Sequence, residues 1–491
     1  MKLVDEQTMR QLDARTIAET ALSGSDLMLR AGEGIADALM RLAQLHQIQQ
    51  PTVLFFAGCG NNGGDAFVAA NALHEQGWGV CCLLAGKPDT LKAEALGAYK
   101  QAIKSGIEMV ACPEPEDWSL EMDADILVDA LLGTGVKGAP YGVMAAAIDR
   151  VNQLADEHLM VSIDLPSAMQ VRADITLSLG LPKRVLAQEE MAEVCGRIEV
   201  IDIGIPTSLV EQVDGAAEEL LVAQDVCSLF KRRLRRSHKG TYGHLLCVGG
   251  SYGMSGAISL AAQAGMRSGA GWVSVQTDAS VQGTIAVAVP EAMVADRAPE
   301  KEVHALLIGP GMGYSEQVCT RVLEELTASD VPLVIDADAF TVLKDHIEVL
   351  SQVERPIVLT PHPGEFATLF GIEVDEVEAD RVAMARMAAM RLGVVVILKG
   401  CRTIIASPEG QIAINSTGNP GMASAGMGDL LAGLVGGLLA QSMPPFQASC
   451  AAVWLHGMAG DVAAAHGAEP SLIASDLLTS LPDAFRQVMP R

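Results

Sequence analysis

One glycine-rich stretch, residues 415–439, carries the clearest chemical signal in the chain. It reads NSTGNPGMASAGMGDLLAGLVGGLL, and Asp429 is its only charged residue. The apolar run Leu430–Leu439 predicts a buried helix, so residues 426–428 form a loop that opens it. Free backbone N–H groups and the helix dipole at such a point suit a phosphate. Asp429 would repel that phosphate, but it could act as a base towards a reacting hydroxyl. A lone Asp there would more simply be a helix N-cap.

A second group of polar residues follows the predicted strand Thr52–Phe56. The loop after it, AGCGNNGGDAF, formally matches the dinucleotide-binding fingerprint G-x-G-x-x-G. That fingerprint also needs an acidic residue at the end of the next strand, and this strand, Gly79–Leu84, ends in Ala-Gly. The loop instead places Asn61, Asn62 and Asp65 among glycines. One Asn would be explained by a helix-start turn with an Asx cap, whereas this cluster favours a binding site.

Two further predicted strands also end in carboxylates. Strand 125–130 ends in Asp129 and leads into LLGTGVKGAP, and strand 159–163 is followed by Asp164-Leu-Pro-Ser. Open α/β sheets bind ligands at the carboxyl ends of their strands. Any one of Asn62, Asp129 and Asp164 could be a satisfied loop residue, but three at equivalent positions predict a site. Oxygen-only ligands there suit a hard monovalent or divalent cation.

The elements that would position these residues form two α/β domains. Residues 1–50 read as helices, and strands at 173–179 and 197–203 close the first domain. The charged segment 216–237 reads as helical and marks the boundary, so we expect domains 1–222 and 223–491. Strands alternating with helices predict doubly wound, mostly parallel sheets in both. In the second domain they are expected at 244–248, from 272, and at 305–308, 332–336, 357–360 and 394–399.

The composition excludes several classes of protein. The 491 residues include 34 Lys and Arg against 60 Asp and Glu, a net charge of −26, which argues against nucleic acid and anionic membranes as partners. The basic run KRRLRR at 231–236 is more simply a solvated linker face or a local phosphate contact. Early acidic residues argue against a signal peptide, and the longest apolar run is too short to span a bilayer. Ten cysteines without C-x-x-C spacing indicate neither zinc nor disulfides, so a cytoplasmic protein is expected. The composition is compatible with a homo-oligomer without requiring one.

The motifs, taken together, resemble a known family. KGTYGHLLCVGGSYGMSGA, GPGMG, TPHPGE, KGCRT and NSTGNPGMASAGMGDLLAG occur in the order found in NAD(P)H-hydrate dehydratases of the ribokinase-like fold. AGCGNNGGDAF, VDALLGTG and SIDLPS resemble the NAD(P)H-hydrate epimerase domain. Fused in this order, they resemble bifunctional nicotinamide nucleotide repair enzymes. The resemblance implies a Rossmann-like and a ribokinase-like three-layer sandwich, ADP- or ATP-driven dehydration of the S hydrate with Mg²⁺, and epimerisation of the R and S hydrates in a domain that binds K⁺.

The resemblance also implies roles for individual residues. In the second domain, Asp429 matches the catalytic residue. Residues matching contacts to the hydrated nucleotide are Ala257, Gly313 and His362, and those matching the ADP or ATP site are Lys399, Gly400, Cys401, Arg402, Thr403, Gly426, Met427 and Gly428. In the first domain, Asp164 matches a substrate-binding residue that could also transfer protons. Residues matching its substrate loops are Asn61, Asn62, Gly63, Gly64, Asp65, Gly133, Thr134, Gly135, Val136, Lys137, Gly138 and Ala139, and those matching potassium ligands are Asn62, Asp129 and Ser167.

Some positions depart from the family pattern or allow a plainer interpretation. Ala66 and Ala168 stand where the family usually has glycine, and the segment after Ser167 is shortened to AMQVRADITL. The epimerase activity of the first domain therefore stays open. His362 could simply cap a turn, and Lys399 could pair with Glu365 rather than with a phosphate.

Two rival functions remain at this level. One is a kinase of the same fold that phosphorylates a vitamin or sugar hydroxyl, because Gly-x-Gly-Asp chemistry serves any alcohol. The PHPGE and KGCRT motifs and the fused first domain favour the dehydratase. The other rival concerns the first domain alone, as a non-catalytic scaffold for nucleotide binding or dimerisation.

Overall fold

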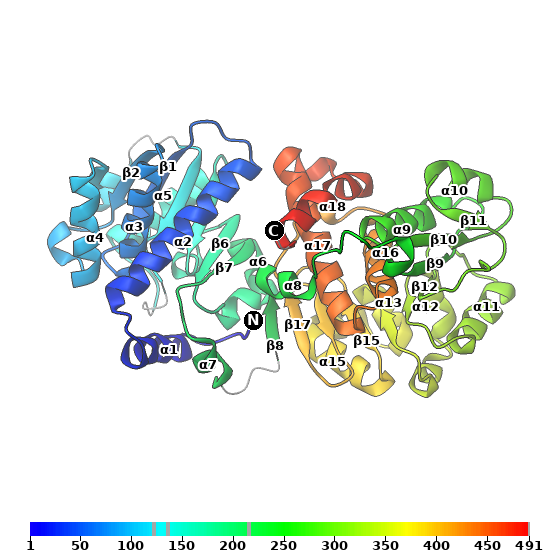
Figure 1. Ribbon diagram of the computed structural model, residues 1–491. Coiled ribbons are helices and arrows are strands. Elements are labelled where there is room, and N and C mark those ends of the chain that lie inside the picture. The colour runs from blue at the N-terminus through cyan, green and yellow to red at the C-terminus, as the bar shows by residue number, and fades with distance from the viewer. Residues whose placement is uncertain (120–123, 134–137, 214–217, 490–491) are drawn as a thin grey trace. The chain divides into compact units, whose positions relative to one another are not determined.

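The chain folds into two compact α/β units. The computed structural model describes residues 1–119, 124–133, 138–213 and 218–489. The units are Met1–Ala216 and Ala217–Arg491 (Figure 1). Strand β8 (Glu218–Leu221) is paired with β17 (Ile412–Asn415) and so belongs to the second unit, ahead of the boundary expected after residue 222. A helix was predicted for this segment because Glu and Leu favour helices, but pairing with β17 outweighs that propensity.

The first unit is built on a parallel sheet of seven strands in the order β3-β2-β1-β4-β5-β6-β7. The direction of the winding reverses between β1 and β4, and a crevice for ligands forms at such a switch point. The short edge strand β3 was not predicted. The strands are β1 (Thr52–Ala57), β2 (Gly79–Leu84), β3 (Glu108–Ala111), β4 (Ile126–Ala130), β5 (Leu159–Ile163), β6 (Ile175–Leu179) and β7 (Arg197–Ile201).

Helices cover both faces of this sheet because its strands are apolar on both sides. Val53 and Phe55 of β1 belong to the core beneath α2, α3 and α4, whereas Leu54 and Phe56 belong to the core beneath α5. This alternation is the two-residue period of a strand. The helices are α1 (Glu6–Glu19), α2 (Gly24–Leu45), α3 (Asn61–Glu75), α4 (Ala93–Lys104), α5 (Val143–Ala155), α6 (Ala192–Cys195) and α7 (Thr207–Glu211).

The second unit contains a sheet of ten strands in the order β11-β10-β9-β12-β13-β14-β15-β16-β17-β8. The sheet is mostly parallel, as expected, and only β16 runs antiparallel to its neighbours. Strands β11, β16 and β17 were not predicted. The strands not yet given are β9 (His244–Val248), β10 (Trp272–Gln276), β11 (Met293–Ala295), β12 (Ala305–Ile308), β13 (Leu333–Ile335), β14 (Ile357–Leu359), β15 (Val395–Leu398) and β16 (Ile404–Ala406).

Helix α16 (Met427–Ala440) is the central helix of the second unit. All its residues except Gly428 and Asp429 are buried, which confirms the predicted buried helix. Within the part of the chain that the structure describes, no helix is long and apolar enough to cross a membrane. The other helices are α8 (Ala223–Leu229), α9 (Ser255–Arg267), α10 (Gln282–Ala288), α11 (Glu316–Thr327), α12 (Asp338–Leu343), α13 (Pro363–Phe370), α14 (Val374–Ala379), α15 (Arg381–Leu392), α17 (Pro445–His466) and α18 (Ala474–Val488).

Glycines let α16 approach α9 closely, and this gives a stability prediction. A Cβ at Gly433 would overlap the carbonyl oxygen of Ala261 and lie 2.7 Å from its carbonyl carbon. Because neither backbone can yield locally, Gly433→Ala should force the helices apart and lower the free energy of unfolding by about 2 kcal/mol despite the better helix propensity of Ala. Gly283→Ala in α10, where a Cβ meets nothing within 4 Å, is the matched control and should gain roughly 0.5–1 kcal/mol. Urea unfolding of both variants checks the difference, and equal stabilities would contradict it.

Candidate active sites

The beginning of α16 provides backbone amides that have no acceptor within the helix, and a carboxylate lies beside them. Gly426 has a positive φ of 89° and precedes the helix, and the first intrahelical hydrogen bond runs from Leu430 N to Gly426 O at 3.2 Å. The amides of residues 427–429 therefore have no acceptor within the helix. Asp429 lies in the first turn, half-buried, and a Cβ on Gly428 would lie 3.2 Å from Lys399 Nζ. The helix start thus brings together amides suited to an anion, a carboxylate suited to act as a base, and an ammonium.

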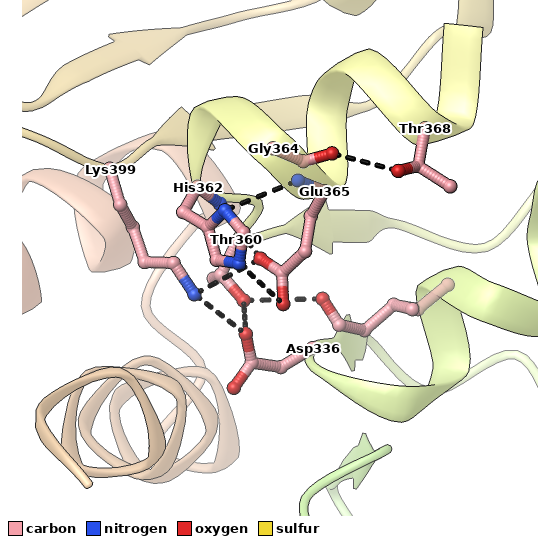
Figure 2. Close-up of polar contacts among 8 residues, drawn as sticks. Asp336, Thr360, His362, Gly364, Glu365, Thr368 and Lys399 are labelled. Carbon is pink, nitrogen blue, oxygen red and sulfur yellow. Dashed lines mark hydrogen bonds and ion pairs between the residues drawn. The ribbon is translucent and has the colours of Figure 1, made fainter. Parts of the chain in front are cut away.

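Lys399 lies in a network of carboxylates at the carboxyl ends of β13, β14 and β15. Its Nζ lies 3.2 Å from Asp336 Oδ1 and 3.5 Å from Glu365 Oε2, so the pairing with Glu365 is present (Figure 2). Burial opposes its charge, yet Asp336 and Glu365 raise the pKa of Lys399 above its usual range. Thr360 Oγ1 donates to Asp336 Oδ1 at 2.7 Å. The neighbouring carboxylates therefore keep the Lys399 ammonium charged although its side chain is partly buried.

His362 has the capping role that its sequence allowed. It is the N-cap of α13: Glu365 N donates to His362 Nδ1 at 3.2 Å, and His362 N donates to Glu365 Oε2 at 2.8 Å. Figure 2 shows this reciprocal pair at the start of the helix. Its side chain is still 56% exposed, so the imidazole remains accessible to a ligand.

The surroundings of Asp429 make it a base suited to neutral pH. Burial, with the negative charges of Asp336, Asp338 and Glu365, raises the pKa of Asp429 to about 7, and Lys399 opposes this shift. A group whose pKa lies near the working pH is an efficient general base. Asp336 and Asp338 were not assigned a role from the sequence, although DADAF ends a predicted strand. Ala337 between them has a positive φ of 51°, an unusual backbone that is often found at functional sites.

Asp338 connects this base to the residues expected to contact the hydrated nucleotide. Its Oδ2 accepts a hydrogen bond of 2.8 Å from Gly313 N. A Cβ on Gly313 would lie 3.2 Å from Met254 Cε, and a Cβ on Gly311 would lie 3.4 Å from that of Ala257. The structure therefore places Gly313, on the loop after β12, close to the first turn of α9, which contains Ala257. Asp338 binds Gly313 and also acts electrostatically on Asp429.

The KGCRT segment forms the loop of the hairpin β15–β16. Arg381 of α15, buried and not singled out from the sequence, holds this loop by its carbonyl groups: Nη1 donates to Cys401 O at 2.6 Å, and Nη2 donates to Lys399 O at 3.1 Å. Gly400 has a φ of 147° and lies against this guanidinium. Arg402 is 9% exposed with Nη1 3.4 Å from Ser416 O, whereas Cys401 is exposed. Thr403 Oγ1 closes the loop on Gly400 O at 2.9 Å.

In the first unit, the three expected potassium ligands meet at the switch point of the sheet. Asp129 Oδ2 accepts from Ser167 N at 2.8 Å and from Ser162 Oγ at 2.9 Å, while Ser167 Oγ donates to Asp129 Oδ1. Burial raises the pKa of Asp129, and these hydrogen bonds oppose the shift. Asn62 Nδ2 donates to Leu132 O at 3.2 Å, and its Oδ1 is buried without a hydrogen-bond partner in the described structure.

The expected substrate loops lie beside this network. Residues 61–65 begin α3, with Asn61 exposed and Asp65 buried, and a Cβ on Gly63 or Gly64 would clash with its surroundings. A Cβ on Gly133 would lie 3.5 Å from Asp164 Oδ2 and 3.6 Å from Asn62 Cβ. Gly138, with φ 90°, and exposed Ala139 follow. The expected residues Thr134, Gly135, Val136 and Lys137 lie outside the described residues.

The shortened segment after Ser167 closes without displacing the network. Ala168 and Met169 both have positive φ, 55° and 54°, where glycine would be favoured. Each such residue costs roughly 1–2 kcal/mol. Ser167 nevertheless keeps its hydrogen bonds to Asp129, and Leu132 N donates to Ser167 Oγ at 2.8 Å. The departure from the family pattern therefore strains the loop and leaves the three oxygen ligands together.

Comparisons with known proteins show what the two units are similar to. A family model described as NAD(P)H-hydrate dehydratase matches residues 245–483, and one described as YjeF-related protein N-terminus matches residues 24–185. A bifunctional NAD(P)H-hydrate repair enzyme of Moorella thermoacetica is 37% identical over 99% of this chain and 97% of its own length. The one of Escherichia coli is 33% identical over 93% and 88%. The ADP/ATP-dependent NAD(P)H-hydrate dehydratase of Bacillus subtilis, co-crystallised with ATP and Mg²⁺, is 33% identical with a TM-score of 0.50, covering 55% of this chain and 98% of that one. Since similarity extends across both units, the chain belongs to the family of bifunctional NAD(P)H-hydrate repair enzymes.

Proposed function

We propose that this chain restores NADH and NADPH from their hydrates, with dehydration in the second unit and epimerisation in the first. The observation that carries the proposal is Asp429, whose pKa is raised to about 7 beside the free amides of α16 and the ammonium of Lys399. These groups suit transfer of a phosphoryl group to a hydroxyl at neutral pH. A kinase for another alcohol is not favoured, because the family resemblance covers the whole chain.

In the proposed dehydration, Asp429 takes the proton of the hydrate's hydroxyl as its oxygen accepts the terminal phosphoryl group of ADP or ATP. The amides of residues 427–429, at the beginning of α16, and Lys399 stabilise the charge on that group. Loss of phosphate, with a proton from the neighbouring ring carbon, then restores the double bond. Arg381 keeps the loop 399–403 in position for the nucleotide.

Two cations fit the residues present. Asp336 and Asp338 lie beside Asp429 with Lys399 opposing their charge, and they would hold a Mg²⁺ that arrives with the nucleotide. When bound, Mg²⁺ neutralises phosphate charge. In the first unit, the unpartnered Oδ1 of Asn62 with the oxygens of Asp129 and Ser167 would hold K⁺. A cation there would offset the cost of burying the carboxylate of Asp129.

Epimerisation is proposed for the crevice between Asn62, Gly133 and Asp164, where Asp164 is the group that moves protons. The retained oxygen ligands support a working site over a scaffold, despite the strain at Ala168.

The experiment that tests the proposal supplies both epimers of NADH hydrate with Mg²⁺ and either ADP or ATP, and follows the NADH absorbance. Conversion of both epimers, faster than spontaneous epimerisation allows, is the expected result. Conversion of the S epimer alone would limit the function to dehydration, and no conversion with either nucleotide would return the chain to the kinase alternative. Asp164→Asn, which leaves the second unit untouched, is the control for spontaneous epimerisation.

A further inference from the structure

Lys183 is a buried lysine of the first unit that neither the family motifs nor the proposed chemistry uses. Its side chain is 2% exposed, and its residue is fixed by a bridge to Val4 and a hydrogen bond of 2.8 Å from Arg184 N to Val4 O. An ammonium has three protons to donate. The structure gives Lys183 Nζ three acceptors: Asp164 Oδ1, Leu179 O at 2.7 Å and Ser178 Oγ at 3.4 Å. The ammonium is therefore fully coordinated and cannot turn elsewhere.

The partner carboxylate, Asp164, is held in an unusual place. It follows β5 with a positive φ of 67°, a left-handed backbone that few residues except glycine, asparagine and aspartate adopt. Its Oδ1 is occupied by Lys183 and, at 3.4 Å, by Leu179 N. Its Oδ2 is the oxygen that lies near Gly133, on the expected substrate loop. The two oxygens thus differ in their surroundings: Oδ1 is bound by Lys183 and Leu179, and Oδ2 lies beside Gly133.

Lys183 also lowers the pKa values of two other carboxylates, Asp13 and Asp65. Burial raises the pKa of Asp13, on α1, to about 6, and it raises the pKa of Asp65, on α3, well above its usual range. In both cases Asp164 raises the pKa further and Lys183 lowers it. The buried ammonium of Lys183 therefore acts on three carboxylates, Asp13, Asp65 and Asp164, which come from different elements. A lysine that served only for packing would not need this arrangement of charges.

Inverting the carbinol carbon requires its C–O bond to break and a new C–O bond to form on the opposite face of the ring. A proton must reach the departing hydroxide, the ring nitrogen supplies the electron pair that stabilises the carbon, and a proton must leave the entering water. One carboxylate oxygen with a fixed direction can serve in this exchange. On the basis of the proposed epimerisation, we infer that Lys183 is a positioning residue, which binds Oδ1 of Asp164 so that Oδ2 faces the hydrated ring.

The test uses the full-length protein without ADP or ATP, so that the dehydratase is idle. Starting from the pure R hydrate, chromatographic separation of the epimers gives kcat and KM. Lys183→Met should lower kcat by at least about 100-fold with KM changed by less than about threefold, because the substrate loops stay in place while the proton-transferring oxygen loses its direction. Lys183→Arg keeps the charge and should recover a large part of the rate. Lys104→Met, exposed at the end of α4, should behave as wild type.

The outcomes separate the inference from the function on which it rests. A wild-type protein that does not interconvert the epimers overturns both. An active wild type with an equally active Lys183→Met variant overturns the positioning role alone, as does a loss that appears in KM rather than in kcat. Where circular dichroism shows that Lys183→Met is unfolded, Lys183→Gln takes its place. A Lys183→Arg variant that folds but is no better than the neutral variants also contradicts the role of the charge.

Discussion

Asp429→Asn is expected to lower the rate of dehydration by at least about 10³-fold while ADP and ATP still bind. The amide keeps the size and the hydrogen-bonding groups of the side chain but cannot accept the hydroxyl proton. In the proposed site, nucleotide binding would depend on the α16 amides and on the loop 399–403, which the substitution leaves in place. The NADH absorbance gives the rate, and titration calorimetry with ADP gives the affinity.

The pH dependence follows from the raised pKa of Asp429. A base must be ionised, so kcat/KM of the wild type for dehydration should rise with pH through about 7 and level off above it.

The raised pKa of Asp429 also has a consequence for the stability of the folded chain. Folding raises the pKa of Asp429 from its ordinary value of 3.8 to about 7. Asp429 therefore contributes stability at low pH, where it is protonated, and this stability is lost as the pH rises through about 7. Asp429→Asn should therefore be more stable than wild type by about 1–3 kcal/mol at pH 8, allowing for partial exposure, and equal to it below pH ~4.

Two results would contradict this assignment. Turnover within about tenfold of wild type would remove Asp429 from the role of base. Loss of nucleotide binding together with turnover would make it a structural residue. Asp375→Asn, an exposed carboxylate in the first turn of α14, is the matched control and should change neither rate nor stability.

The sequence predicted those parts of the sites that depend on local pattern. Small residues followed by an apolar run placed Asp429 at the start of a buried helix, because α16 is apolar around its whole circumference. The ends of parallel strands placed Asn62, Asp129 and Asp164 at one edge, because such strands share their direction in the sheet. Strands β11, β16 and β17 were missed, whereas the equally short β12, β13, β14 and β15 were predicted because a recognisable motif follows each of them.

The residues that the sequence did not reveal act on partners distant along the chain. Arg381 donates to the carbonyl groups of Leu398, Lys399 and Cys401, and Lys183 donates to Asp164. A single Lys or Arg in an amphipathic segment looks like a solvated residue, since only the folded chain shows what it faces. Asp336 and Asp338 could have been noticed in the sequence, because two carboxylates directly follow a predicted strand. Nothing in the sequence, however, connects them to Asp429.

Lys399→Met gives the second large effect, because it removes the cation that opposes the carboxylates around Asp429. Lys399 lies 3.2 Å from Asp336 Oδ1 and lowers the pKa of Asp429. Without it, that pKa should rise further above 7, and the limb of the pH–rate profile should move to higher pH. At pH 7 the combined loss of ionised base and of phosphate binding should lower kcat/KM by about 10²–10³-fold, with partial recovery near pH 9.

Matched substitutions separate charge from packing at this site. Lys399→Arg keeps a positive charge, so its pH limb should stay close to that of wild type even if its rate falls. Lys344→Met, at the exposed end of α12, should leave both the rate and its dependence on pH unchanged. A Lys399→Met profile that is lower at every pH but has the same midpoint would mean that Lys399 binds phosphate without tuning Asp429. A midpoint that moves to higher pH in the Met variant alone would show that this half-buried ammonium determines the pH at which the base becomes active.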